Sequence, residues 1–128
     1  MNETVVRSEK LYRVVKRSQP DTIDEHGNPT SALFKQDDGV SVDRDGGRLE
    51  SEIIDRFKEY FGQRFKGLVR VGADVCLDND MAVIPDHGYH AEIFDDCQKT
   101  PLSQLKALIL ADSCRVVAFE SNIAWVNL

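Results

Sequence analysis

The sequence predicts a single α+β domain built on a mainly antiparallel or mixed sheet with two principal helices. The 128-residue chain has the length of one domain. Short segments rich in β-branched and aromatic residues are bunched along it and do not alternate with helices. Only two segments space their apolar residues as a helix does. We therefore take residues 1–128 as one domain and expect residues 1–10 to form a flexible N-terminal segment.

The first half of the chain carries strand signals and then one long helix. Residues 11–17 are rich in aromatic and β-branched types, and residues 40–43 alternate apolar and polar side chains. Between them, residues 31–35 fit a short strand or an irregular crossing. Residues 49–66 place apolar side chains on one helical face, and Gly67 supplies a stop. The aromatic residues of that face are expected in the core: Phe57, Tyr60, Phe61 and Phe65.

The second half predicts short strands around a second helix. Further strands are expected at residues 68–71, 81–84, 89–94, 115–119 and 123–126. Residues 72–80 fit either a short helix or a turn, and Pro85 would end the strand before it. Thr100 and Pro101 fit the cap and the first position of a helix. Its buried face would carry Leu102, Leu105, Leu108 and Ile109.

Composition limits the functions open to the chain. Sixteen Lys and Arg against 22 Asp and Glu give a net charge of −6, which argues against non-specific nucleic-acid binding but leaves room for a local basic patch. Three cysteines at irregular spacing do not indicate a disulfide framework. The N-terminus lacks a signal-peptide pattern, and no apolar run approaches the roughly 20 residues of a membrane span. We expect a cytoplasmic, reduced protein.

The most informative stretch is Tyr89-His90-Ala91-Glu92-Ile93. His90 and Glu92 lie two apart on an expected strand, so they share one face while Ala91 and Ile93 turn to the other. A histidine and a carboxylate on one face can transfer protons near neutral pH. The alternative is a polar strand face in contact with water. His-x-Glu is also half of the zinc site of nucleobase deaminases, but the Pro-Cys-x-x-Cys half is absent.

A zinc site would need further ligands, and the candidates are Cys97, Cys114 and His87. They lack the spacing of a known zinc site, and Cys114 fits a small buried hydrophobe better than a ligand. We therefore expect no metal and no cofactor.

Polar residues on two other expected strands extend this site into a possible cleft. Ser41 and Asp43 share one strand face, and Arg13 lies mid-strand, where it needs water or an anionic partner. If these strands neighbour that of His90, the polar residues form one cleft. Arg13, Ser41 and Glu92 on separate strands also resemble the Arg, Ser and Glu of the dinucleotide site in ADP-ribosyltransferases. The alternative is that Arg13 and Asp43 pair across strands.

The order of short motifs resembles that of a set of small uncharacterised bacterial proteins. Those proteins share a Tyr-Arg opening, a Ser-x-x-Phe stretch, a Ser-Val-Asp strand and a late His-Ala. The matching segments are Tyr12-Arg13, Ser31-Ala32-Leu33-Phe34, Ser41-Val42-Asp43 and His90-Ala91. The likeness runs from Leu11 to about Val117. It implies a bacterial or phage cytoplasmic protein and says nothing about mechanism.

Two functions follow as hypotheses. The one we favour from the sequence is a small protein-interaction, accessory or immunity-type module whose partner is another protein. Trp125, on the last expected hairpin, is its candidate contact residue, although a tryptophan there is also explained as core. Nucleic acid and membranes are not expected partners.

The second hypothesis is an enzyme or binder acting on a nucleotide-like small molecule. Arg13 would hold an anion, Ser41 and Asp43 would position the ligand, and His90 and Glu92 would transfer protons. This site requires Arg13 and His90 to lie on the same side of the sheet.

Overall fold

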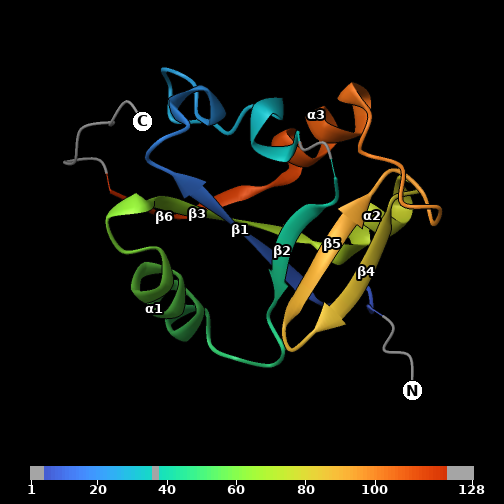
Figure 1. Cartoon of the computed structure of the whole chain (residues 1–128), viewed down its shortest axis with the longest axis horizontal. Helices are drawn as coiled ribbons and strands as arrows, with labels where there is room; N and C mark the ends of the chain where they lie inside the picture. The colour runs from blue at the N-terminus through green and yellow to red at the C-terminus, as the bar shows by residue number, and fades with distance from the viewer. Residues whose placement is uncertain (1–4, 36–37, 121–128) are drawn as a thin grey trace.

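A computed structural model describes residues 5–35 and 38–120, and these residues form one six-stranded antiparallel sheet with three α-helices (Figure 1). The strand order is β4-β5-β2-β1-β3-β6. The predicted single-domain α+β fold with an antiparallel sheet is confirmed. In the part of the chain that the structure describes, no helix combines the length and the apolar character that crossing a bilayer requires.

The elements have the following bounds. The strands are β1 (Lys10–Lys16), β2 (Val40–Arg44), β3 (Phe65–Gly72), β4 (Ala82–His87), β5 (His90–Phe94) and β6 (Arg115–Phe119). The helices are α1 (Glu50–Phe61), α2 (Ala73–Asp78) and α3 (Gln104–Ser113), and the 3₁₀ turns are η1 (Pro20–Thr22), η2 (Ser31–Phe34) and η3 (Gly62–Arg64). The strand expected at residues 123–126, and with it Trp125, lies outside the described residues.

The first long helix ends earlier than predicted. α1 stops at Phe61 because Gly62 adopts a φ of 54°, which glycine accepts without steric cost. Phe65 therefore opens β3 and is 2% exposed. Gly67, the predicted stop, lies inside that strand. Tyr60, expected in the core, is 76% exposed. The apolar spacing runs on past Gly62, so periodicity alone could not locate the break.

The second long helix also begins elsewhere. Its cap is Ser103, whose hydroxyl accepts a hydrogen bond from the Lys106 backbone N–H, and not Thr100. Leu105 and Leu108, expected on the buried face, are 67% and 45% exposed. The buried residues are instead Leu102, Ala107, Leu110 and Ala111. The segment is apolar around most of its circumference, so its pattern does not single out one face.

The structure decides between the two alternatives that the sequence allowed for each of two shorter segments. Residues 31–35 form the turn η2, an irregular crossing, and residues 72–80 contain the short helix α2. β4 continues past Pro85, which was expected to end it. It can do so because β4 is an edge strand, where a residue without an N–H donor is tolerated.

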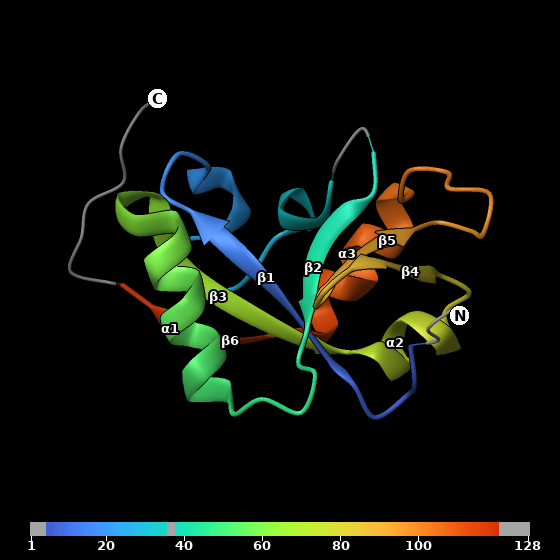
Figure 2. The same ribbon diagram turned by 60° about the horizontal axis from the view of Figure 1, so that its bottom comes forward.

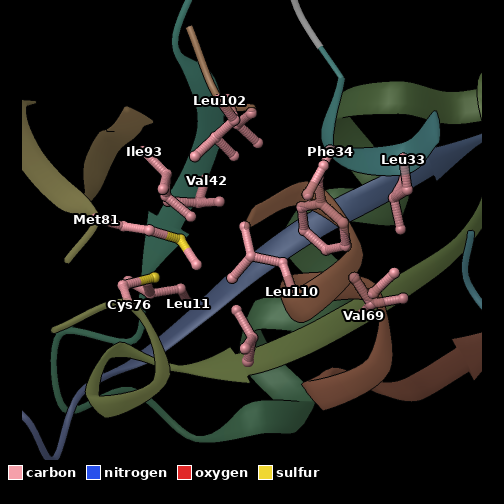
Figure 3. Close-up of a cluster of buried hydrophobic side chains, with 14 of the residues drawn as sticks. Leu11, Leu33, Phe34, Val42, Val69, Cys76, Met81, Ile93, Leu102 and Leu110 are labelled. Carbon is pink, nitrogen blue, oxygen red and sulfur yellow. The ribbon is translucent and has the colours of Figure 1, made fainter. Parts of the chain in front are cut away.

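Strand alternation gives the sheet two unlike faces. The closed face, marked by Leu11, Val42, Val69 and Ile93, packs beneath η2, α2 and α3 in the larger apolar cluster (Figure 3). The open face carries α1, which packs over β1 and β3 through a smaller cluster around Ile53. Figure 2 shows α1 and α3 on opposite sides of the sheet, and α1 does not cover β2 or β5.

Candidate functional site

A groove of about 650 Å³ lies on the open face, between α1, β1, β2 and the β4–β5 hairpin. It exists because α1 covers only the β1–β3 side of this face, while the hairpin forms an opposite wall with residues 87–90. We call it the open-face groove.

Strand register brings four of the predicted site residues to the same face. In the β2–β5 ladder Asp43 is opposite His90, and Ser41 is opposite Glu92. Ala91, between the two site residues of β5, is completely buried in the closed-face core. The predicted sharing of a face by these pairs is confirmed. Ser41, Asp43 and His90 line the groove, whereas Glu92 is not among its lining residues.

Arg13 does not join this set, so the predicted site with Arg13 and His90 on the same side of the sheet is wrong. Leu11 and Val15 flank it on the closed face, so its side chain leaves β1 on the side opposite that of His90. The predicted cross-strand pair of Arg13 and Asp43 is also wrong, because Tyr12 is the residue opposite Asp43.

The Arg13 guanidinium instead fills the gap where β1 and β2 diverge. Its Nε donates to the Leu33 carbonyl at 2.7 Å and its Nη1 to the Ser41 carbonyl at 2.8 Å. Burial without a carboxylate beside it lowers the pKa of Arg13 to about 10. Arg13 is among the residues that line the groove, but its guanidinium is held by these two carbonyls and not by the polar residues of the open face.

The groove concentrates positive charge in a protein whose net charge is −6. Only one carboxylate, that of Asp43, stands among its lining residues. Within residues 5–35 and 38–120, Lys16 has no carboxylate partner, and burial together with the neighbouring cations of Arg13 and Arg64 lowers its pKa. Besides Arg13, the cationic residues that line the groove are Lys16, Arg48, Arg56 and Arg64.

Aromatic rings lie among these cations. The Arg48 guanidinium stacks on Tyr89, 3.6 Å from the ring centroid, and Arg64 lies 5.0 Å from the Phe61 centroid. Tyr60 packs edge-on against Phe61, with 4.9 Å between centroids, and leaves most of its own ring in solvent. The groove therefore combines positive charge with flat aromatic surface.

Asp43 is the carboxylate best placed for chemistry in the groove. Burial raises its pKa above the ordinary range, although Arg48, at 3.9 Å, and His90 act in the opposite direction. A carboxyl group with a raised pKa opposite a histidine can exchange a proton or orient a polar ligand group. Asp43 thus takes the position beside His90 that the sequence analysis gave to Glu92.

The thiols considered as zinc ligands do not meet at one place. Cys97 is exposed, whereas Cys114 caps the end of α3 and burial raises its pKa to about 11. Cys76 is buried in the closed-face core, which raises its pKa to about 12. The β4–β5 hairpin instead brings together Asp86, His87 and His90, whose possible ligand atoms lie within 4.8 Å of one another.

Sequence reasoning missed the basic wall of the groove. Arg56 and Tyr60 are spaced by four residues on α1, the interval that aligns side chains on a helix, and Arg64 follows in η3 after the break at Gly62. That stripe was visible in the sequence, but it reads as an ordinary solvated helix face until the position of α1 on the sheet is known.

No protein-family model, curated protein or solved structure matches this chain. Its function is therefore argued from the groove.

Proposed function

We propose that this protein binds a nucleotide-like anionic small molecule in the open-face groove, at a site that does not use Arg13 as the anion-holding residue. The observation that carries the proposal is the gathering of four cations, Lys16, Arg48, Arg56 and Arg64, around one carboxylate in an acidic protein. Guanidinium groups match phosphate oxygens in geometry and charge. Repulsion between Lys16 and Arg64, which contributes to the lowered pKa of Lys16, would be relieved by an anion placed between them.

The aromatic residues favour a ligand that also carries a flat ring. Tyr60 is exposed beside the basic wall, and stacking of a base on such a ring contributes roughly 1–3 kcal/mol. Tyr89 already stacks with Arg48, which orders both side chains at the hairpin wall. The groove volume of about 650 Å³ lies inside the range of small-molecule sites, so a mononucleotide fits better than a long polymer.

The remaining polar residues have positioning roles in this proposal. Ser41 and Asp43 lie on β2 along the groove and would hydrogen-bond the sugar or the base. His90, opposite Asp43, supplies an imidazole whose ring nitrogens can donate and accept protons, so proton transfer to a bound ligand is chemically accessible.

The test is isothermal titration calorimetry with ATP, GTP, CTP and UTP, with inorganic phosphate and a 20-nucleotide oligothymidine as further probes. We expect at least one nucleotide to bind with one site per chain. Arg56→Ala and Arg64→Ala should each weaken binding roughly tenfold, as expected for a lost charged hydrogen bond. Arg115→Ala is the matched control, because Arg115 is exposed on β6 and is not a lining residue.

Two outcomes would contradict the proposal. One is the absence of binding by every nucleotide. The other is binding that Arg115→Ala weakens as much as Arg56→Ala does. Binding of oligothymidine alone, with a steep dependence on salt, would replace the proposal with nucleic-acid binding. The protein-interaction hypothesis stays a prediction, and loss of a captured partner on Trp125→Ala would support it.

A further inference from the structure

The tip of the β4–β5 hairpin holds a carboxylate between two imidazoles. His90 Nδ1 lies 2.6 Å from Asp86 Oδ1 and 2.8 Å from Asp86 Oδ2, and His87 Nδ1 lies 3.3 Å from Asp86 Oδ1. The two imidazole rings stack, with centroids 5.1 Å apart and planes 22° apart. One potential ligand atom from each residue thus lies within 4.8 Å of the other two.

The hairpin itself creates this arrangement. His87 and His90 are the last cross-strand pair before the turn, so their rings share one side of the ladder. In a regular strand Asp86 and His87 would face opposite sides, but the register shifts between Pro85 and His87. Such a bulge redirects side chains. Gly88 closes the turn with a φ of 52°.

We propose that Asp86, His87 and His90 form a binding site for a divalent transition-metal ion of the zinc class. Two imidazole nitrogens and one carboxylate suit zinc, cobalt or nickel, whereas magnesium and calcium prefer sites made of oxygen ligands. Three protein ligands leave a fourth position free for water or another molecule. His87 and His90 also line the open-face groove, so the ion would sit at the groove rim.

One of the two contacts with Asp86 already has the separation that a bound ion requires, and the other must open. Ligands at about 2.0–2.1 Å from zinc in a tetrahedral site stand about 3.3 Å apart. The His87 to Asp86 separation already has that value, at 3.3 Å. The 2.6 Å contact between His90 and Asp86 is a hydrogen-bond distance, and it would lengthen when the metal replaces the shared proton.

Exposure of the ligands also fits binding from solution. The side chains of His87 and Asp86 are 80% and 42% exposed, so an ion reaches them without opening the fold. His90, at 26% exposure, is the inner ligand and connects the site to Asp43 across the β2–β5 ladder. The site does not depend on the proposed function, because metal binding can be measured without any nucleotide.

The test is titration of the full chain with zinc chloride alone, followed by calorimetry and by the histidine ring signals in NMR spectra. A Cys97→Ser background removes the exposed thiol as a competing ligand. We expect one zinc ion per chain, with shifts at His87 and His90 but not at His26. His87→Ala and His90→Ala should each weaken binding roughly a hundredfold, since each removes one of three protein ligands.

His26→Ala is the matched control, because His26 lies in another loop, is 76% exposed and contacts Glu25 at 3.5 Å. It should leave zinc binding unchanged. Thermal unfolding of each variant without metal checks that the fold is intact, and His87→Ala is the decisive variant because its side chain is the most exposed of the three ligands. Absence of stoichiometric zinc binding, or equal binding by His87→Ala and wild type, would overturn the proposal. Tighter binding of magnesium than of zinc would overturn it as well.

Discussion

The two faces of the sheet differ in what they contribute: one carries most of the buried core and the other carries the groove. The closed face buries a continuous apolar layer in which Phe34, Leu110 and Val40 have no exposed surface. The open face is covered by α1 over only part of its area and leaves Ser41, Asp43 and the basic groove accessible. Hydrophobic burial is the dominant stabilising contribution to folding. The comparison indicates that one face supplies most of the stability, which lets the other hold like charges close together.

The largest expected effect contrasts one aromatic residue from each face. Phe34→Ala should lower the free energy of unfolding by about 3–5 kcal/mol, because it leaves a cavity in the closed-face core. Tyr60→Ala should lower it by about 1 kcal/mol or less, since only its edge contact with Phe61 is lost. Urea denaturation monitored by circular dichroism measures both. Equal losses for the two variants would refute the division between the faces.

A smaller effect is expected where α1 is attached to the sheet. The Tyr12 hydroxyl donates to Glu50 Oε1 at 2.9 Å, and Arg70 Nη1 donates to the same oxygen at 2.6 Å. Tyr12→Phe should destabilise the fold by about 1 kcal/mol, the contribution of one such hydrogen bond. Tyr89→Phe is the matched control, because no hydrogen bond of its hydroxyl to a described residue is seen and it should change stability by less than about 0.5 kcal/mol.

The raised pKa of Tyr12 also makes the stability of the protein depend on pH. Burial and the hydrogen bond to Glu50 raise the pKa of Tyr12 to about 12, whereas in the unfolded chain a tyrosine loses its proton at about pH 10. The folded state then binds more protons between those values, so stability falls as pH rises through this window. Tyr12→Phe should lack that part of the decline. If the free energy of unfolding fell with the same slope above pH 10 in Tyr12→Phe and in wild type, the decline could not be assigned to Tyr12.

The smallest expected effect is a gain in stability on the open face. Because burial raises the pKa of Asp43, its charged form disfavours the folded state at neutral pH. Asp43→Asn should therefore stabilise the protein at pH 7 by on the order of a few tenths of a kcal/mol, a small figure because the side chain is 34% exposed and screened by solvent.

The pH dependence of this gain checks its cause. As the pH falls through the raised pKa of Asp43 and then below about 3.9, the wild-type carboxyl becomes neutral in both states. The difference between Asp43→Asn and wild type should then vanish. A gain that persists at pH 3, seen by thermal unfolding at both pH values, would mean that the charge of Asp43 is not its source.

The sequence predicted what depends on local alternation and missed what depends on how elements are placed. His90 with Glu92, and Ser41 with Asp43, share a face because strand side chains alternate with a period of two. The groove depends on the strand order and on α1 stopping at Gly62, neither of which the apolar pattern specifies. For the same reason the outward position of Tyr60 was not predicted.

The hairpin cluster shows the same limit on a smaller scale. A period of two assigns Asp86 and His87 to opposite sides, and only the register shift after Pro85 brings both to His90. A bulge of one residue leaves little trace in composition or spacing. Arg13 is the converse case, because alternation does place it on the closed face, but its bonds to Leu33 and Ser41 depend on the divergence of β1 and β2.

Pro85 has a consequence for self-association. β4 is one of the two outer strands of the sheet, and an outer strand with free backbone groups invites a strand from another molecule to add to it, which is how many proteins aggregate. Pro85 offers no backbone N–H, and the irregular register beside it breaks the regular row of donors and acceptors that an incoming strand would need. Pro85 therefore also opposes the addition of strands from other molecules at the β4 edge of the sheet.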